Sequence, residues 1–232
     1  MLKLAVFDLD GTLAPVGGPI DDQSVKLLKE LEDLGIYIVI SSGKTLYYLI
    51  GMFRQVGLRA PIFIGENGNV TAFGIDLPPK LLTAVQPTEK YFQNKDEIIR
   101  NLKELFPDGF WMQPNEIMLT LFFKNETVRN GIRKYLNNLK KDDIIVYEHV
   151  DSFDITPVGI DKKTSLQALG NHLHIASNEM IAVGDGANDL PMIDYCAYSI
   201  GIGALDKHLT TWHFDKIDRA LIFLQEKIQH DQ

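Results

Sequence analysis

Two aspartates, Asp8 and Asp10, stand two residues apart near the start of the chain, in the segment VFDLDGT. The run before them, Leu2 to Phe7, is apolar at every position except Lys3, which is typical of a parallel strand covered on both faces. Ligands of open α/β sheets bind at the carboxyl ends of such strands. Two carboxylates this close ionise together at low cost only if a cation joins them, or else one takes a proton. Because Mg²⁺ prefers carboxylate, water and phosphate oxygens, the pair predicts a Mg²⁺ site with a shared proton.

The residues that follow fit such a site. Gly11 permits close approach of the backbone, and the Thr12 hydroxyl can tie the loop. A plain turn rich in aspartate is the simpler alternative. A calcium-binding EF-hand loop is disfavoured, because its pattern needs a preceding helix and a glycine at the sixth position, where Leu13 stands.

A second acidic pair, Asp185 and Asp189, follows an apolar run in the segment AVGDGAND. The segment is similar to the glycine-rich dinucleotide fingerprint, but Asp189 stands where the third glycine belongs. Both acids would also repel a pyrophosphate at the start of the next helix. We therefore interpret Asp185 and Asp189 as metal ligands opposite Asp8 and Asp10. A solvated acidic turn is the alternative.

Two further segments carry groups suited to phosphate. In ISSGKT, Ser42 and Gly43 follow a predicted strand, and a hydroxyl with open N–H groups at a helix start forms a phosphate cradle. Serine is also a common helix N-cap, which is the alternative. In VGIDKKT, Lys162 and Lys163 begin a predicted helix, where a lysine opposes the helix dipole. That cost is explained if one lysine neutralises a phosphate; otherwise both are surface charges.

The elements that must position these residues alternate between strand and helix, which indicates an α/β fold with a parallel sheet. Between the segments ISSGKT and VGIDKKT the order of predicted strands and helices changes. A polar helix at 88–105, a strand at 116–124, an amphipathic helix near 128–139 and strands at 143–150 and 152–156 form a separate pattern. We expect a Rossmann-like parallel-sheet core domain, residues 1–77 and 156–232, with a smaller inserted α+β cap domain, residues 78–155.

Composition excludes some functions. The 31 Asp and Glu residues exceed the 23 Lys and Arg residues, giving a net charge of −8, which argues against nucleic acid or an anionic membrane as partner. Asp8 interrupts the first apolar run too early for a signal peptide, and no apolar stretch approaches the ~20 residues that span a bilayer. The single cysteine, Cys196, fits a reducing compartment. We expect a cytoplasmic soluble protein, and no obligate protein partner is evident.

These motifs, in this order, resemble those of the haloacid dehalogenase superfamily of phosphotransferases, and the resemblance covers the whole chain. It consists of D-x-D-G-T at Asp8 to Thr12, a hydroxyl before glycine at Ser42-Gly43, the lysine Lys162, and G-D-x-x-N-D at Gly184 to Asp189. The insertion and the segment GENG resemble the subfamily with an α+β cap. That subfamily includes Cof-type sugar phosphatases, archaeal-type phosphoglycolate phosphatases and phosphomannomutases. The short cap and SSGK resemble the phosphoglycolate group most.

The resemblance implies a role for each residue. Asp8 would be the nucleophile that forms an aspartyl-phosphate, and Asp10 would act as general acid and then general base. The phosphoryl group would be held by Ser42, Gly43, Lys162 and Asn188. The Mg²⁺ ligands would be the Asp8 carboxylate, the Asp10 backbone carbonyl, Asp185 and Asp189.

Two positions depart from the superfamily pattern. Many relatives carry T-G-R where this chain has Ser42-Gly43-Lys44, which keeps the hydroxyl but replaces an arginine. They often carry Lys-Gly where this chain has Lys162-Lys163, and the register of the motif favours Lys162.

We therefore expect a Mg²⁺-dependent phosphatase acting on small phosphorylated metabolites, such as phosphoglycolate or sugar phosphates. The alternatives are a sugar phosphomutase of the phosphomannomutase kind and a non-catalytic metal- or phosphate-binding module. Other residues are interpreted as packing, capping or surface residues: Trp111, His172, His174, Cys196 and Trp212. Four polar residues near the end of the cap are interpreted mainly as a solvated strand edge, with contact to the substrate as the alternative: Glu148, His149, Asp151 and Asp154.

Overall fold

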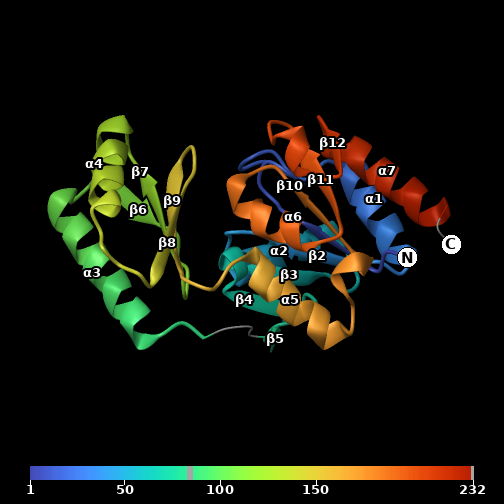
Figure 1. Cartoon of the computed structure of the whole chain (residues 1–232), viewed down its shortest axis with the longest axis horizontal. Helices are drawn as coiled ribbons and strands as arrows, with labels where there is room; N and C mark the ends of the chain where they lie inside the picture. Colours follow the sequence, from blue (N-terminus) through green and yellow to red (C-terminus); the bar gives the residue numbers. More distant parts are fainter. Residues whose placement is uncertain (83–85, 231–232) are drawn as a thin grey trace. The chain divides into compact units, whose positions relative to one another are not determined.

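The computed structural model describes residues 1–82 and 86–230, which form two compact units. The larger unit contains Met1–Ala84 and Asp161–Gln232, and the smaller unit is Val85–Ile160 (Figure 1). Both limits lie a few residues beyond those expected from the sequence. Strand β5 (Lys80–Leu82) still pairs within the larger sheet, and strand β9 (Ser152–Pro157) belongs throughout to the smaller one.

An eight-stranded sheet forms the centre of the larger unit, in the order β12-β11-β10-β1-β2-β3-β4-β5. The run from β12 to β3 is parallel, while β4 and β5 add antiparallel to its edge. This confirms the expected Rossmann-like sheet. The remaining strand bounds are β1 (Leu4–Phe7), β2 (Tyr37–Ser41), β3 (Ile62–Gly65), β4 (Val70–Phe73), β10 (Met180–Gly184), β11 (Tyr198–Ile202) and β12 (Trp212–Phe214).

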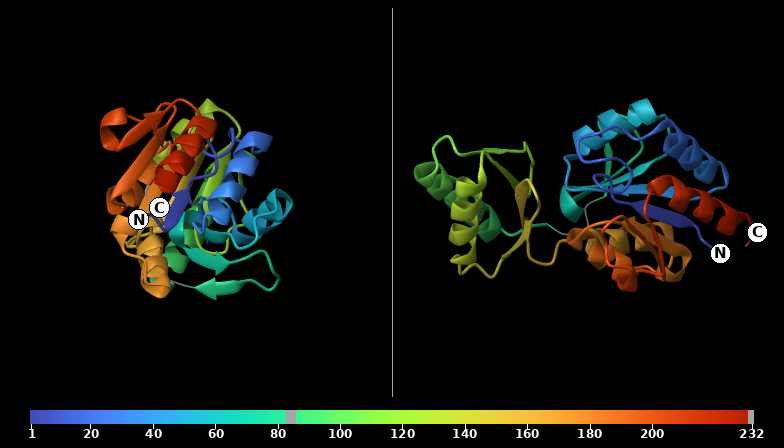
Figure 2. Two further views of the ribbon diagram at one scale, coloured as in Figure 1. Left: turned by 90° about the vertical axis from the view of Figure 1, so that its right-hand side faces the viewer. Right: turned by 90° about the horizontal axis from the view of Figure 1, so that it is seen from above.

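Helices cover both faces of this sheet, as Figures 1 and 2 show. One face packs against α1 (Asp22–Asp33), α2 (Leu46–Val56) and α7 (Ile217–His230), and the other against α5 (Lys162–Leu173) and α6 (Leu190–Tyr195). Strand β1 lies between the two layers. Its side chains alternate, so that Ala5 and Phe7 join one apolar cluster while Leu4 and Val6 join the other. A strand apolar at every position is therefore explained by burial on both faces.

Short 3₁₀ turns complete the larger unit: η1 (Glu66–Gly68), η2 (Ser177–Glu179), η3 (Ala187–Asp189) and η4 (Lys207–Leu209). Two of them, η1 and η3, follow the ends of strands β3 and β10. Both therefore lie at the carboxyl edge of the parallel sheet, where ligands of such folds bind.

The smaller unit is an antiparallel sheet in the order β6-β7-β9-β8 with two helices on one face. Its sheet contains β6 (Phe110–Met112), β7 (Leu119–Phe123) and β8 (Ile144–Glu148) in addition to β9. Helices α3 (Glu89–Leu105) and α4 (Glu126–Asn137) bury Ile98, Leu102 and Ile132 against Leu121 and Phe153 of the sheet. The unit is thus the expected α+β insertion.

Within residues 1–82 and 86–230, no helix combines the length and the apolar character that a bilayer span requires.

The apolar face of α3 offers a direct test of this packing. Leu102 is fully buried in the core of the smaller unit, whereas Leu105, one turn further along α3, is 57% exposed. Leu102→Ala should lower the free energy of unfolding by about 2–5 kcal/mol, because it leaves a cavity. Leu105→Ala should change it by less than about 0.5 kcal/mol. Urea unfolding followed by circular dichroism measures both, and equal losses would contradict the observed packing.

Candidate active site

A buried lysine joins the two acidic segments of the chain. The ammonium of Lys162 lies 2.6 Å from Asp8 Oδ1 and 2.6 Å from Asp189 Oδ1. Asp8 directly follows β1, Asp189 ends the 3₁₀ turn η3 after β10, and Lys162 is the first residue of α5. Lys162 is only 1% exposed. The neighbouring Lys163 makes neither of these bonds, so the structure distinguishes the two lysines.

The acidic turn at Asp185 is fixed by its own hydrogen bonds. Oδ2 of Asp189 accepts from the backbone N–H groups of Asp185 and Gly186, each at 3.0 Å. The Thr12 hydroxyl donates to Asp185 Oδ1 at 2.7 Å, and so ties the turn to the loop after β1. Gly11 is required beside it: its φ is +93°, and a Cβ there would lie 2.3 Å from Asp185 Oδ2.

Three carboxylates meet as a result. Asp8, Asp185 and Asp189 each offer one oxygen, and these oxygens all lie within 4.8 Å of one another. A set of carboxylate oxygens without sulfur or nitrogen suits a hard divalent cation. The structure thus brings together the three carboxylates expected as metal ligands, and the expected contribution of the Asp10 backbone carbonyl stays a prediction.

Burial dominates the electrostatics of this cluster. It raises the pKa of Asp8 to about 7, with the nearby charge of Asp189 acting in the same direction and Lys162 opposing. Burial also raises the pKa of Asp185. Burial by itself would lower the pKa of Lys162, but the charges of Asp189 and Asp8 outweigh it and raise that pKa above its ordinary value. The lysine is therefore held as a cation between the two carboxylates.

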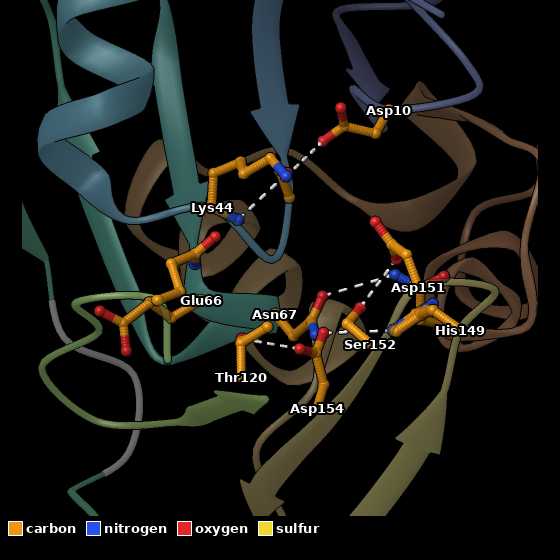
Figure 3. Close-up of polar contacts among 12 residues, drawn as sticks. Asp10, Lys44, Glu66, Asn67, Thr120, His149, Asp151, Ser152 and Asp154 are labelled. Atoms are coloured by element: carbon orange, nitrogen blue, oxygen red, sulfur yellow. Dashed lines mark hydrogen bonds and ion pairs between the residues drawn. The ribbon is translucent and has the colours of Figure 1, made fainter. Parts of the chain in front are cut away.

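Asp10 has different partners from Asp8. Its Oδ2 lies 3.2 Å from the Lys44 ammonium (Figure 3). Its Oδ1 accepts from the Gly17 N–H at 3.3 Å. The sequence suggested that one shared cation and a shared proton relieve the repulsion between Asp8 and Asp10. In the structure Asp8 faces Lys162 and Asp10 faces Lys44, and the shared metal ion and proton stay predictions.

The remaining expected phosphate-binding residues lie in turns at the same edge of the sheet. Ser42 is buried directly after β2, and its Oγ accepts from the Lys44 N–H at 3.2 Å. Gly43 is the next residue in that turn. Asn188 lies in η3, where its Nδ2 is 3.5 Å from Oδ1 of Asn67.

The turn η1 positions Lys162, a role that the sequence did not suggest. Glu66 and Asn67 both adopt left-handed backbone conformations, with φ of 51° and 53°. Gly68 follows with φ of +108°, and a Cβ there would lie 2.1 Å from the Asp161 carbonyl oxygen. The Ser165 hydroxyl donates to the Gly68 carbonyl. Strained backbone of this kind persists where the surroundings over-determine it, and here it fixes the start of α5.

Turn η1 joins the antiparallel strands β3 and β4. Its contact with the start of α5 could not be predicted, because nothing in the local sequence pattern encodes it. The pairing of Lys44 with Asp10 could not be predicted for the same reason, since the sequence shows only a lysine in place of the superfamily's arginine.

The two adjacent lysines provide a matched test of the buried bridge. Lys162→Met removes the cation between Asp8 and Asp189, and should lower the free energy of unfolding by about 3–5 kcal/mol in metal-free buffer. Lys163→Met should change it by less than about 0.5 kcal/mol. Denaturant unfolding followed by circular dichroism gives both values. Similar losses in the two variants would contradict the bridging role of Lys162.

The chain is similar to known proteins over most of its length. The sequence model of the haloacid dehalogenase-like hydrolase family matches residues 5–78 and 82–211. The chain is 23% identical over 208 residues to a phosphoglycolate phosphatase of Methanothermobacter thermautotrophicus, covering 90% of this chain and 88% of the relative. It is 22% identical over 210 residues to a 5-amino-6-(5-phospho-D-ribitylamino)uracil phosphatase of Bacillus subtilis, covering 87% and 84%.

The fold is shared with solved structures as well. A haloacid dehalogenase-like hydrolase from Bacteroides thetaiotaomicron superposes with a TM-score of 0.79 at 18% identity, covering 97% of this chain and all of that chain. The family match spans most of the chain and includes every motif that forms the carboxylate cluster. This chain therefore belongs to the haloacid dehalogenase-like hydrolase family.

Proposed function

We propose that the protein is a Mg²⁺-dependent phosphatase that hydrolyses small phosphorylated metabolites through an aspartyl-phosphate on Asp8. One observation carries the proposal: the Lys162 ammonium lies 2.6 Å from Asp8, beside two further carboxylates at the carboxyl edge of a parallel sheet. A carboxylate nucleophile needs cations around it, since it attacks a phosphoryl group that is itself negative.

The hydrogen bonds of the cluster support a particular choice of metal ligands. Both oxygens of Asp189 are engaged, one by Lys162 and the other by two backbone N–H groups. Asp8 and Asp185 are therefore the better placed carboxylate ligands, with the Asp10 carbonyl and Asp189 completing the proposed set. When bound, Mg²⁺ neutralises charge on the transferring phosphoryl oxygens and keeps Asp8 ionised.

In the first step Asp8 attacks phosphorus. A bond forms between the Asp8 carboxylate oxygen and phosphorus, and the ester bond to the substrate oxygen breaks. Asp10, as general acid, donates its proton to the departing oxygen, which leaves as an alcohol. Lys162, the Ser42 hydroxyl, Gly43 and Asn188 hold the phosphoryl oxygens during the transfer.

In the second step water hydrolyses the aspartyl-phosphate. Asp10, now a carboxylate, takes a proton from water as the water oxygen attacks phosphorus. The bond between phosphorus and Asp8 breaks, and inorganic phosphate is released. Asp8 returns as a carboxylate and Asp10 returns protonated, so the cycle closes with no other reactant consumed.

The substrate class is proposed from the relatives and from charge. Two relatives are named as phosphatases of phosphoglycolate and of a phosphorylated ribitylaminouracil. Both of these substrates are small phosphate esters. A net charge of −8 fits a small metabolite better than a polyanion. We also propose a cytoplasmic location, because a chain with one cysteine forms no internal disulfide, which fits a reducing compartment.

Replacing the nucleophile tests the proposal. With Mg²⁺ present, the wild type should release phosphate from at least one of phosphoglycolate, sugar phosphates and phosphoserine, and Asp8→Asn should abolish that release. Asp194→Asn, at an exposed site on α6, is the matched control and should keep wild-type activity. Circular dichroism checks that Asp8→Asn folds.

Three outcomes would overturn the proposal. Full activity of Asp8→Asn would exclude Asp8 as nucleophile. Isomerised sugar phosphate without free phosphate would indicate a phosphomutase. Tight binding without turnover of any ester would indicate a binding module.

Metal affinity should depend on pH through Asp8. Its pKa of about 7 in the metal-free protein means that a proton competes with Mg²⁺ below that pH. The apparent dissociation constant should rise about tenfold for each pH unit below pH 7 and level off above it. Titration calorimetry between about pH 5.5 and about pH 8.5 measures this. Asp8→Asn should bind more weakly and with less pH dependence, whereas a flat wild-type profile would contradict the role of Asp8.

A further inference from the structure

The carboxylate of Asp10 is held from two sides, by a backbone group of its own loop and by a lysine from the segment after β2. Lys44 contacts one oxygen at 3.2 Å (Figure 3). The Gly17 N–H donates to the other at 3.3 Å. The Asp10 and Lys44 side chains are only 25% and 27% exposed, so solvent screens the pair less than an open surface pair. The orientation of Asp10 is thus determined by its surroundings rather than by its own loop alone.

Lys44 is itself firmly placed. Its N–H donates to Ser42 Oγ at 3.2 Å, and its carbonyl accepts from the Glu66 N–H at 3.0 Å. The next residue, Thr45, is the N-cap of helix α2. The backbone that carries the ammonium is therefore fixed between strand β2, helix α2 and turn η1.

We propose that Lys44 is a positioning residue that directs the Asp10 carboxyl for proton transfer. This inference rests on the proposed function, in which Asp10 gives a proton to the departing oxygen and later takes one from water. General acid catalysis contributes roughly 10²–10⁴-fold, and it does so only when the acid lies within hydrogen-bond reach of the oxygen. An acid free to rotate loses part of that factor.

The leaving group provides the decisive test. Departure of an alkoxide requires a proton, whereas 4-nitrophenolate leaves without one. Lys44→Met should therefore reduce kcat/KM for glycerol 2-phosphate by about 10–100-fold and for 4-nitrophenyl phosphate by less than about threefold. Lys44→Arg should restore much of the loss. Lys26→Met, at an exposed lysine on α1, is the control and should match the wild type on both esters.

A double-mutant cycle separates an effect through Asp10 from an independent one. Asp10→Ala should show the same dependence on leaving group as Lys44→Met. Adding Lys44→Met to Asp10→Ala should cost less than about twofold more, because the residue that Lys44 orients is already gone. Should Lys44→Met fail to fold, Lys44→Gln serves in the same cycle.

Other outcomes would overturn the inference. Equal losses on both esters, or additive losses in the double variant, would show a structural role. Weaker inhibition by inorganic phosphate in Lys44→Met would show a direct substrate contact. These results are distinct from failure of the proposed function, in which the wild type releases no phosphate from either ester or Asp8→Asn remains active.

Discussion

The ammonium of Lys162 between Asp8 and Asp189 is the interaction on which the rest of the site depends. Taking three charges out of water costs several kcal/mol for each ion, and only close geometry offsets that cost. The end of β1, the turn after β10 and the start of α5 must therefore keep fixed positions. The capping box of Asp161 with Thr164 and the contact of Gly68 with Asp161 hold the lysine end of this arrangement. The N–H groups of the Asp185 turn hold the other end.

Two aspartates close in sequence acquire different surroundings, because Asp8 lies directly after β1 and Asp10 lies further out in the loop that follows. Asp8 is buried among carboxylates and one lysine, while Asp10 lies in a partly exposed loop beside another lysine. Separate environments are how one fold assigns separate tasks to two identical side chains. In the proposed reaction one of them bonds to phosphorus and the other moves protons, and these tasks need opposite degrees of access to water.

The sequence predicted the fold class because its signals are local and strong. The unbroken apolar run of β1 indicates a strand buried on both faces. The different order of predicted strands and helices after residue 76 indicates an insertion. The short strand β5 was missed, which shifted the expected domain limit. Two contacts could not be predicted, because each joins segments that are distant in the chain. The pairing of Lys44 with Asp10 depends on how far the lysine side chain reaches, and the close packing of Gly68 against Asp161 depends on the backbone conformation of the turn. The assigned roles of the site residues stay predictions.

The position of β1 in the middle of the sheet has a consequence for synthesis of the chain. One neighbour, β2, emerges from the ribosome soon after it, but the other, β10, is encoded more than 170 residues later. Until then one edge of β1 is an open template for pairing with other chains. The nascent chain also carries Asp8 without the lysine that neutralises it. The need for chaperones during translation should therefore increase with the time for which that edge of β1 stays unpaired, and should depend less on the stability of the folded protein.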